Sequence, residues 1–169
     1  MDGMHQGSLG QSEVTELINV EKICEKPDEV MQPPSELRGR VAECALKSVD
    51  GKDGFIFSMR AGNTSVSVNL LTNNYLIRSS EWHVSLVRID LKSRSHRNPD
   101  GTKVGPDHVH IYDAVRLDKQ AYPLSVLSPA LSGSSSMEEI LHGLWKFCNV
   151  TRPPRIILSL LDSLPPQGE

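Results

Sequence analysis

The sequence predicts an α+β fold, in which an antiparallel β-meander of five to seven strands carries one or two helices on a face, preceded by an acidic N-terminal helix. Three observations predict it. Hydrophobic and polar residues alternate in several short segments between residues 37 and 91, and a three- and four-residue hydrophobic period appears after residue 136. An acidic segment with helical periodicity precedes both. A chain of 169 residues suffices for one hydrophobic core.

The N-terminal segment 1–36 is acidic, with eight acidic and two basic residues and hence a net charge of −6. Its hydrophobic positions predict an amphipathic helix from Ser12, the expected cap, to Cys24. Pro27 and the segment 32–34 then form a linker. Two interpretations stay open: a solvated helix packed on the domain, or a detachable acidic arm that covers a basic surface or meets a partner.

The alternating segments predict the strands of an α+β core domain at 37–154. Turns are expected at Asp50-Gly51 and at Asn73-Asn74, because these residue types tolerate the conformations that tight hairpins require. Further strands are predicted at 75–78 and at 82–91, where Arg88 and Asp90 are expected on the same side as Leu86.

The C-terminal third predicts two helices. Ser136 and Glu139 form a capping box before a helix of about 13 residues. Residues 155–169 are expected to be a short helix, at 155–164, and a polar tail. The residues expected to share one core lie on the apolar faces of their elements: Phe55, Phe57, Val66, Val68, Leu70, Leu86, Leu141, Leu144 and Trp145.

Composition predicts a cytoplasmic protein. Apolar runs are too short for a membrane span, and residues 1–11 are neither basic nor apolar, so no signal peptide is expected. Cys24, Cys44 and Cys148 are odd in number and widely spaced, which favours reduced thiols that serve in packing.

The segment 93–113, "SRSHRNPDGTKVGPDHVHIYD", is the densest in chemically versatile side chains. Residues 98–101 predict a type I turn, and 108–113 the returning strand. In a strand, His108 and His110 project from the same face about 6.5–7 Å apart along the chain, so both imidazoles can meet one metal ion or one phosphate.

Three interpretations of this segment remain open. A metal site would need His108, His110 and one of His96, Asp90 or Asp107. In the second, the imidazoles carry out metal-free acid/base catalysis on RNA while cations stabilise the developing charge. In the third, aspartates simply hydrogen-bond the imidazoles and the turn backbone.

Of these, the metal-free site defines the predicted catalytic residues, and no metal or other cofactor is expected. His96, His108 and His110 are the acid/base candidates, and Asp90 orients a histidine. The stretch 88–103 has a net charge of +3, which favours polyanions. Its candidate nucleic-acid-binding residues are Arg88, Arg94, Arg97 and Lys103.

The order of these motifs resembles a known family. The set W82-x5-R88-x-D90, H96-x-N98-P99-D100-G101 and P106-x-H108-x-H110-I111-Y112, followed by A121-Y122-P123-L124, resembles a domain family of unknown function. Its members are small bacterial proteins often encoded on phages and integrative elements. The order R-x-D, H and P-x-H-x-H is also similar to that of TumE-like toxins of bacterial toxin–antitoxin pairs.

The second resemblance implies a proteotoxic or RNA-directed activity that a partner protein holds in check. Two function classes therefore stay open. The first is an RNA-directed enzyme of a mobile-element or antiviral defence system. The second is a non-enzymatic accessory or inhibitor protein that binds a protein or nucleoprotein partner, in which the histidine segment is structural. A protein partner is expected in both, with RNA as a second candidate ligand and no membrane.

Overall fold

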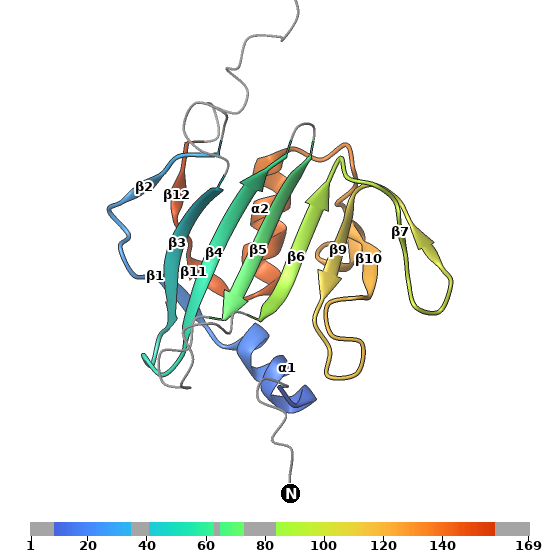
Figure 1. Ribbon diagram of the computed structural model, residues 1–169. Coiled ribbons are helices and arrows are strands. Elements are labelled where there is room, and N and C mark those ends of the chain that lie inside the picture. Colours follow the sequence, from blue (N-terminus) through green and yellow to red (C-terminus); the bar gives the residue numbers. More distant parts are fainter. Residues whose placement is uncertain (1–8, 35–40, 63–64, 73–83, 158–169) are drawn as a thin grey trace, which may run out of the picture.

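The computed structural model describes residues 9–34, 41–62, 65–72 and 84–157 (Figure 1). The helical elements are α1 (Gln11–Asn19), the 3-10 turn η1 (Leu124–Val126) and α2 (Met137–Phe147). The strands are β1 (Lys22–Cys24), β2 (Val30–Met31), β3 (Val41–Ser48), β4 (Gly54–Ala61), β5 (Val66–Thr72), β6 (Ser85–Leu91), β7 (His96–Arg97), β8 (Lys103–Val104), β9 (His108–Ile111), β10 (Ala121–Pro123), β11 (Val150–Arg152) and β12 (Arg155–Ile156).

The central element is an eight-stranded sheet in the order β10-β9-β6-β5-β4-β3-β1-β11. Neighbouring strands are antiparallel except for β1 and β11, which are parallel. The α+β class is therefore confirmed. The predicted count of five to seven strands is too low, because β1 and β11 come from segments that were assigned to helix or to no element. The predicted strand 75–78 and the turn at Asn73-Asn74 lie outside the described residues.

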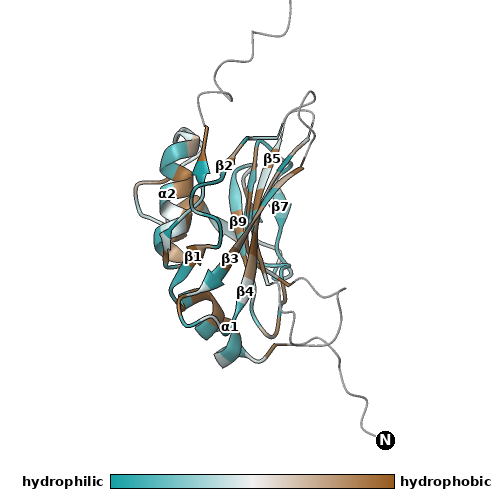
Figure 2. Ribbon diagram, turned by 90° about the vertical axis from the view of Figure 1, so that its left-hand side faces the viewer, coloured by the Kyte–Doolittle hydropathy of each residue, from teal (hydrophilic) through white to brown (hydrophobic). Residues whose placement is uncertain are grey.

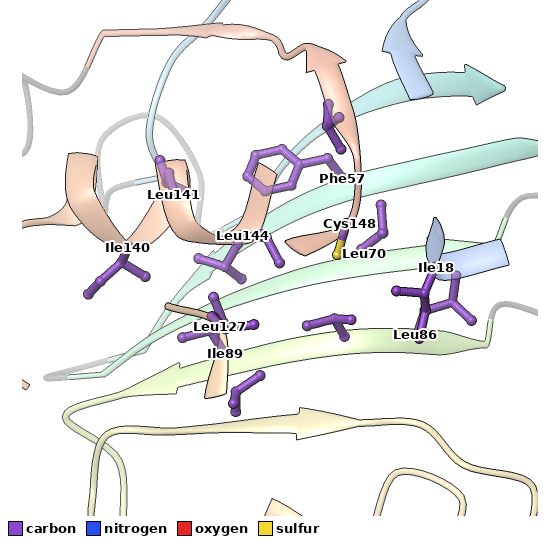
Figure 3. Packing of buried hydrophobic residues seen from close by; sticks show 14 of the residues in the cluster. Ile18, Phe57, Leu70, Leu86, Ile89, Leu127, Ile140, Leu141, Leu144 and Cys148 are labelled. Atoms are coloured by element: carbon purple, nitrogen blue, oxygen red, sulfur yellow. The ribbon is translucent and has the colours of Figure 1, made fainter. Parts of the chain in front are cut away.

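Both α-helices lie on one side of the sheet, and the β7–β8 hairpin lies on the other (Figure 2). Leu141 and Leu144 of α2 pack against the sheet face that carries Phe57 and Leu70 (Figure 3). The expected core is confirmed: seven of its nine residues are buried, while Val66 and Trp145 are partly buried and pack against them. Among the described residues, no helix is long and apolar enough to cross a membrane.

The N-terminal helix is shorter than predicted. It ends at Asn19, and Gly10 rather than Ser12 is its N-cap, with the Glu13 carboxylate accepting the Gly10 N–H. Residues 22–24 form β1 instead of the last helical turn, because they pair with β3 on one side and β11 on the other. Val14 and Ile18 are buried in the common core, so α1 is docked in this structure.

The C-terminal prediction is confirmed for its first helix and wrong for the start of the second. The Ser136 hydroxyl accepts the Glu139 N–H, and the Glu139 carboxylate accepts the Ser136 N–H, as the capping box requires. Arg155 and Ile156 form β12, which pairs in parallel with β2, so they are not helical. Residues 158–169 lie outside the described part of the chain.

β6 contains a β-bulge at Leu86, which shifts the alternation of its side chains between the two faces of the sheet by one residue. Leu70 of β5 pairs with Val87, but Leu71 pairs with Ser85, so Leu86 is an extra residue without a partner. Leu86 is fully buried on the core face (Figure 3). Arg88 and Asp90 lie on the opposite face, where Asp90 contacts Ser67 and His108. The predicted placement of all three on one side is therefore wrong, and Trp82 lies outside the described residues.

A buried lysine joins both helices to the sheet. The Lys22 side chain is fully buried, and its ammonium group donates to the carbonyl oxygens of Ile18, Val20 and Cys148 at 2.7–2.9 Å. Its Nζ atom also lies 4.9 Å from the centre of the Phe55 ring, a cation–π distance. Burial lowers the pKa of Lys22 to about 8.

The three cysteines are free thiols. Cys24 and Cys148 are buried and Cys44 is half-buried, in agreement with the predicted packing role. Burial raises the pKa of both Cys44 and Cys148 to about 12, which keeps these thiols protonated near neutral pH.

Candidate functional site

The sheet face opposite the helices carries the predicted catalytic residues in two neighbouring rows. In one row Asp90 lies between Ser67 and His108, its partners on the adjacent strands. In the next row Arg88 pairs with His110 in the same way. This register results from the period of two in β6 and β9, which also places Ile89 and Val109 together on the core side.

The β7–β8 hairpin brings a third histidine to these rows. Asn98 is buried, and its side chain both accepts the N–H of Ala121 and donates to the carbonyl oxygen of the same residue. It thereby attaches the hairpin to β10, the edge strand of the sheet. The predicted turn is confirmed by the bond from the Gly101 N–H to the Asn98 carbonyl oxygen. His96 is thus held over the sheet face.

His96, His108 and His110 form one group, here called the histidine cluster. Their ring centres lie 4.8 Å apart for His96 and His110, 5.0 Å for His108 and His110, and 5.7 Å for His96 and His108. One nitrogen from each ring falls within 4.8 Å of the others. His108 and His110 are only 3% and 2% exposed, while His96 is half-buried.

Backbone carbonyls fix the tautomers of two of these rings. The Nε2 atom of His96 lies 2.8 Å from the Lys119 carbonyl oxygen, and the Nδ1 atom of His108 lies 2.7 Å from that of Gly105. A carbonyl oxygen only accepts, so each of these nitrogens carries a proton. In the neutral rings, Nδ1 of His96 and Nε2 of His108 therefore present lone pairs.

The Asp90 carboxylate is the charged centre of the site. One oxygen accepts from Ser67 at 2.9 Å, and the other lies 3.2 Å from Nε of Arg88 and 3.5 Å from Nε2 of both His108 and His110. Burial would raise the pKa of Asp90, but these contacts outweigh it and hold the pKa well below its usual value. Asp90 in turn raises the pKa of His108, against the effect of burial.

His110, unlike His96, His108 and Asp90, makes no hydrogen bond through its side chain. Both of its ring nitrogens are buried and neither makes a hydrogen bond, although Nε2 lies 3.5 Å from the Asp90 carboxylate. Buried polar atoms are rarely left unsatisfied, because each costs about 1–3 kcal/mol. An unsatisfied imidazole therefore marks a position where a buried water or a further ligand is expected.

The predicted phosphate-binding residues divide into two groups. Arg88 belongs to the site, where its guanidinium bridges Asp90 and Asp118. Arg94, Arg97 and Lys103 are exposed on the β7–β8 hairpin. Arg97 and Lys103 are cross-strand partners, and the alternation along the strand turns them away from the side that His96 occupies.

Asp100 and Asp107 of the segment 93–113 hydrogen-bond to nearby turn and loop residues instead of to the histidines. Asp100 accepts from the N–H and hydroxyl of Thr102, and Asp107 accepts the N–H of Lys92. Asp107 is therefore not part of the histidine cluster. Sequence reasoning did not identify Ser67, although the polar positions of its alternating strand indicated which face it lies on. Nothing in the sequence indicated the two backbone carbonyls that orient His96 and His108.

The fold and the site together define an α+β protein with a buried histidine–aspartate site on the helix-free face of its sheet. The chain belongs to a family of unknown function, DUF6978, whose model matches residues 9–150. The family-level resemblance to an uncharacterised domain family is thereby confirmed. No curated protein and no solved structure matches the chain.

Proposed function

We propose that this protein acts on RNA through the site formed by the histidine cluster, Asp90 and Arg88. In this proposal it is a toxin-like component of a phage, mobile-element or antiviral defence system, works in the cytoplasm, and is restrained by a protein partner. The observation that carries the proposal is the convergence of three imidazoles, a carboxylate and a guanidinium next to a hairpin with three exposed cations.

The chemistry of RNA cleavage needs groups of these kinds. Attack of a 2′-hydroxyl on its phosphate requires that one proton be removed and another be delivered to the leaving oxygen. Positive charge must also stabilise the developing charge on the phosphate oxygens. The half-buried His96 offers one acid/base group and the half-buried Arg88 offers the positive charge, while His108 or His110 would supply the second acid/base group. Arg94, Arg97 and Lys103 offer contacts to flanking phosphates.

One observation favours the second candidate, a non-enzymatic accessory or inhibitor protein. His108 and His110 are nearly inaccessible, so an RNA strand cannot touch them without a rearrangement of the hairpin. In that case the site stabilises the β7–β8 hairpin. The exposed hairpin and sheet face then bind the surface of a protein or nucleoprotein partner.

Cleavage of labelled single-stranded and double-stranded RNA by purified protein tests the first candidate. His96→Gln is expected to lower the cleavage rate by on the order of 10²-fold or more, with the fold retained. His142→Gln, on the exposed side of α2, is the matched control and should cleave at the wild-type rate. Wild-type protein that leaves both substrates intact would refute the enzymatic proposal.

RNA binding separates the two candidates further. The double variant Arg97→Ala/Lys103→Ala should weaken RNA binding and flatten its salt dependence, because two phosphate contacts are removed. Expression of the same variants in bacteria, with growth as the readout, tests toxicity. If growth arrest is unaffected by His96→Gln but abolished by the hairpin variant, the binding candidate is favoured.

A further inference from the structure

We infer that the histidine cluster and Asp90 form a binding site for one divalent transition-metal ion, such as zinc. This inference rests on the proposed function and deepens it by naming the group that the site holds; within it, His96 is a metal ligand rather than an acid/base group. It departs from the expectation of no metal that the sequence suggested. It also explains why two of the three imidazoles are buried, since an ion can occupy a site that an RNA strand cannot enter.

His110 lacks the partners that a bound metal ion would supply. Its side chain is 2% exposed, both of its nitrogens lack hydrogen-bond partners, and its ring lies against the other two histidines of the cluster. A neutral imidazole lone pair that coordinates a metal ion is satisfied by that bond.

Asp90 lies at the distance from two imidazoles that ligands of one metal ion keep from each other. Nε2 of His108 and Nε2 of His110 each lie 3.5 Å from the same carboxylate oxygen. Neighbouring ligands of a tetrahedral zinc ion are about 3.4 Å apart when the metal–ligand bonds are about 2.1 Å long. The observed spacing is long for a hydrogen bond between charged groups and fits two ligands that share an ion.

Backbone carbonyls orient the rings of His96 and His108. His96 and His108 each donate one ring N–H to a backbone carbonyl, of Lys119 and Gly105 respectively. Ligating histidines in proteins are held by this kind of bond, which fixes the tautomer that presents a lone pair to the metal. The ligand set is therefore Nδ1 of His96, Nε2 of His108 and Nε2 of His110, with the carboxylate oxygen of Asp90.

The positive charge of Arg88 disfavours binding of a metal cation next to it. Its Nε atom lies 3.2 Å from the Asp90 oxygen in question, and its other end contacts Asp118 at 3.4 Å. Two carboxylates thus offset one guanidinium and leave a net negative charge, besides the neutral imidazoles, to attract a cation. One nitrogen from each of the three rings lies within 4.8 Å of the others. This is longer than the spacing of ligands around one ion, so the rings must move slightly inward to complete the coordination.

The test is titration of untagged, chelator-treated protein with zinc chloride in a calorimeter and with cobalt chloride in a spectrophotometer. An affinity tag of histidines would bind these ions and must be absent. One equivalent of each metal is expected, and the cobalt spectrum should lack a thiolate charge-transfer band because no cysteine is a ligand. His142→Gln and Cys44→Ser are the controls and should bind like wild type.

His110→Gln and His96→Gln are each expected to weaken zinc binding by at least about 10²-fold, since even loss of a residue that only orients a ligand costs 10–100-fold. His96→Gln leaves the sheet rows untouched, so it keeps the test meaningful if His110→Gln fails to fold. Wild-type protein without metal binding, or binding that survives both substitutions, overturns the inference. These titrations contain no RNA, so a stoichiometric metal in a protein that does not cleave RNA refutes the proposed function alone. RNA cleavage by wild-type protein that binds neither zinc nor cobalt refutes the metal site alone.

Discussion

The Nζ atom of Lys22 lies 2.7 Å from the carbonyl oxygen of Cys148, at a sequence separation of 126 residues. Cys148 is the C-cap of α2, and the other two acceptors of Lys22, the carbonyl oxygens of Ile18 and Val20, belong to the end of α1. The ends of both helices therefore share one cation. Such carbonyls lack partners within the helix and carry partial negative charge, so a buried ammonium group satisfies them.

Replacement of Lys22 by methionine should destabilise the protein strongly. Lys22→Met keeps most of the apolar volume but leaves three carbonyl oxygens in the interior without this donor. We expect the free energy of unfolding to fall by about 2–4 kcal/mol, measured by urea denaturation. Lys47→Met, at an exposed position of β3, is the control and should change it by less than about 0.5 kcal/mol. Equal effects of the two substitutions would contradict the role given to Lys22.

The lowered pKa of Lys22 also predicts a pH dependence. Between pH 8, close to the pKa of Lys22 in the folded protein, and pH 10.5, the ordinary pKa of a lysine, the unfolded chain binds more protons at Lys22 than the folded one does. The contribution of Lys22 to stability therefore rises with pH across this window, and it is lost as the pH falls through 8.

The measurement compares wild type with Lys22→Met, so that other titrating groups cancel. The difference in unfolding free energy between them should grow by on the order of 1–3 kcal/mol from pH 7.5 to pH 10. A difference that shrinks over this range would show that Lys22 prefers to be charged in the folded protein.

Packing of α2 on the sheet is tested at Leu144. This side chain is fully buried among the residues that the sequence assigned to the core. Leu144→Ala should lower the free energy of unfolding by about 2–5 kcal/mol, because it leaves a cavity. Val115→Ala is the control, since Val115 is 90% exposed, and it should have almost no effect in the same denaturation experiment.

The attachment of the β7–β8 hairpin is tested at Asn98. Asn98→Ala removes both bonds to the backbone of Ala121 and should release the hairpin from β10. Hydrogen exchange of the Ala121 N–H is expected to accelerate by 10-fold or more, while amides of β4 keep their protection. Thr102→Ala is a control for the turn itself, because Thr102 contacts Asn98 without reaching Ala121. Unchanged exchange at Ala121 in Asn98→Ala would show that other contacts hold the hairpin.

The parts of the fold that depend on local patterns were predictable. The alternation in β3, β4 and β5 and the capping box of α2 are properties of short segments, and the core residues followed from them. The same alternation predicted that His108 and His110 share a face. That His96 joins them was only a hypothesis, because its position depends on the pairing of Asn98 with Ala121 across 23 residues.

The errors come from contacts that are distant in sequence or from local irregularities. Lys22–Cys24 continued a helical hydrophobic pattern, yet pairing with β3 and β11 makes it a strand, since tertiary contacts override a weak local preference. The bulge at Leu86 shifts the alternation of β6 by one residue, and nothing in that hydrophobic run reveals it. Arg155 and Ile156 form a strand for the same reason as β1, through pairing with a distant partner.

The parallel pairing of β1 with β11 sets the order in which the sheet can assemble. The hairpins between β3, β4, β5 and β6 join neighbouring segments of the chain and close short loops. The β1–β11 pair brings Lys22 beside Val150 and must close the long loop between these residues, which costs more entropy and is slow. We therefore expect the meander to form first, and the mixed edge with its buried lysine to form after it.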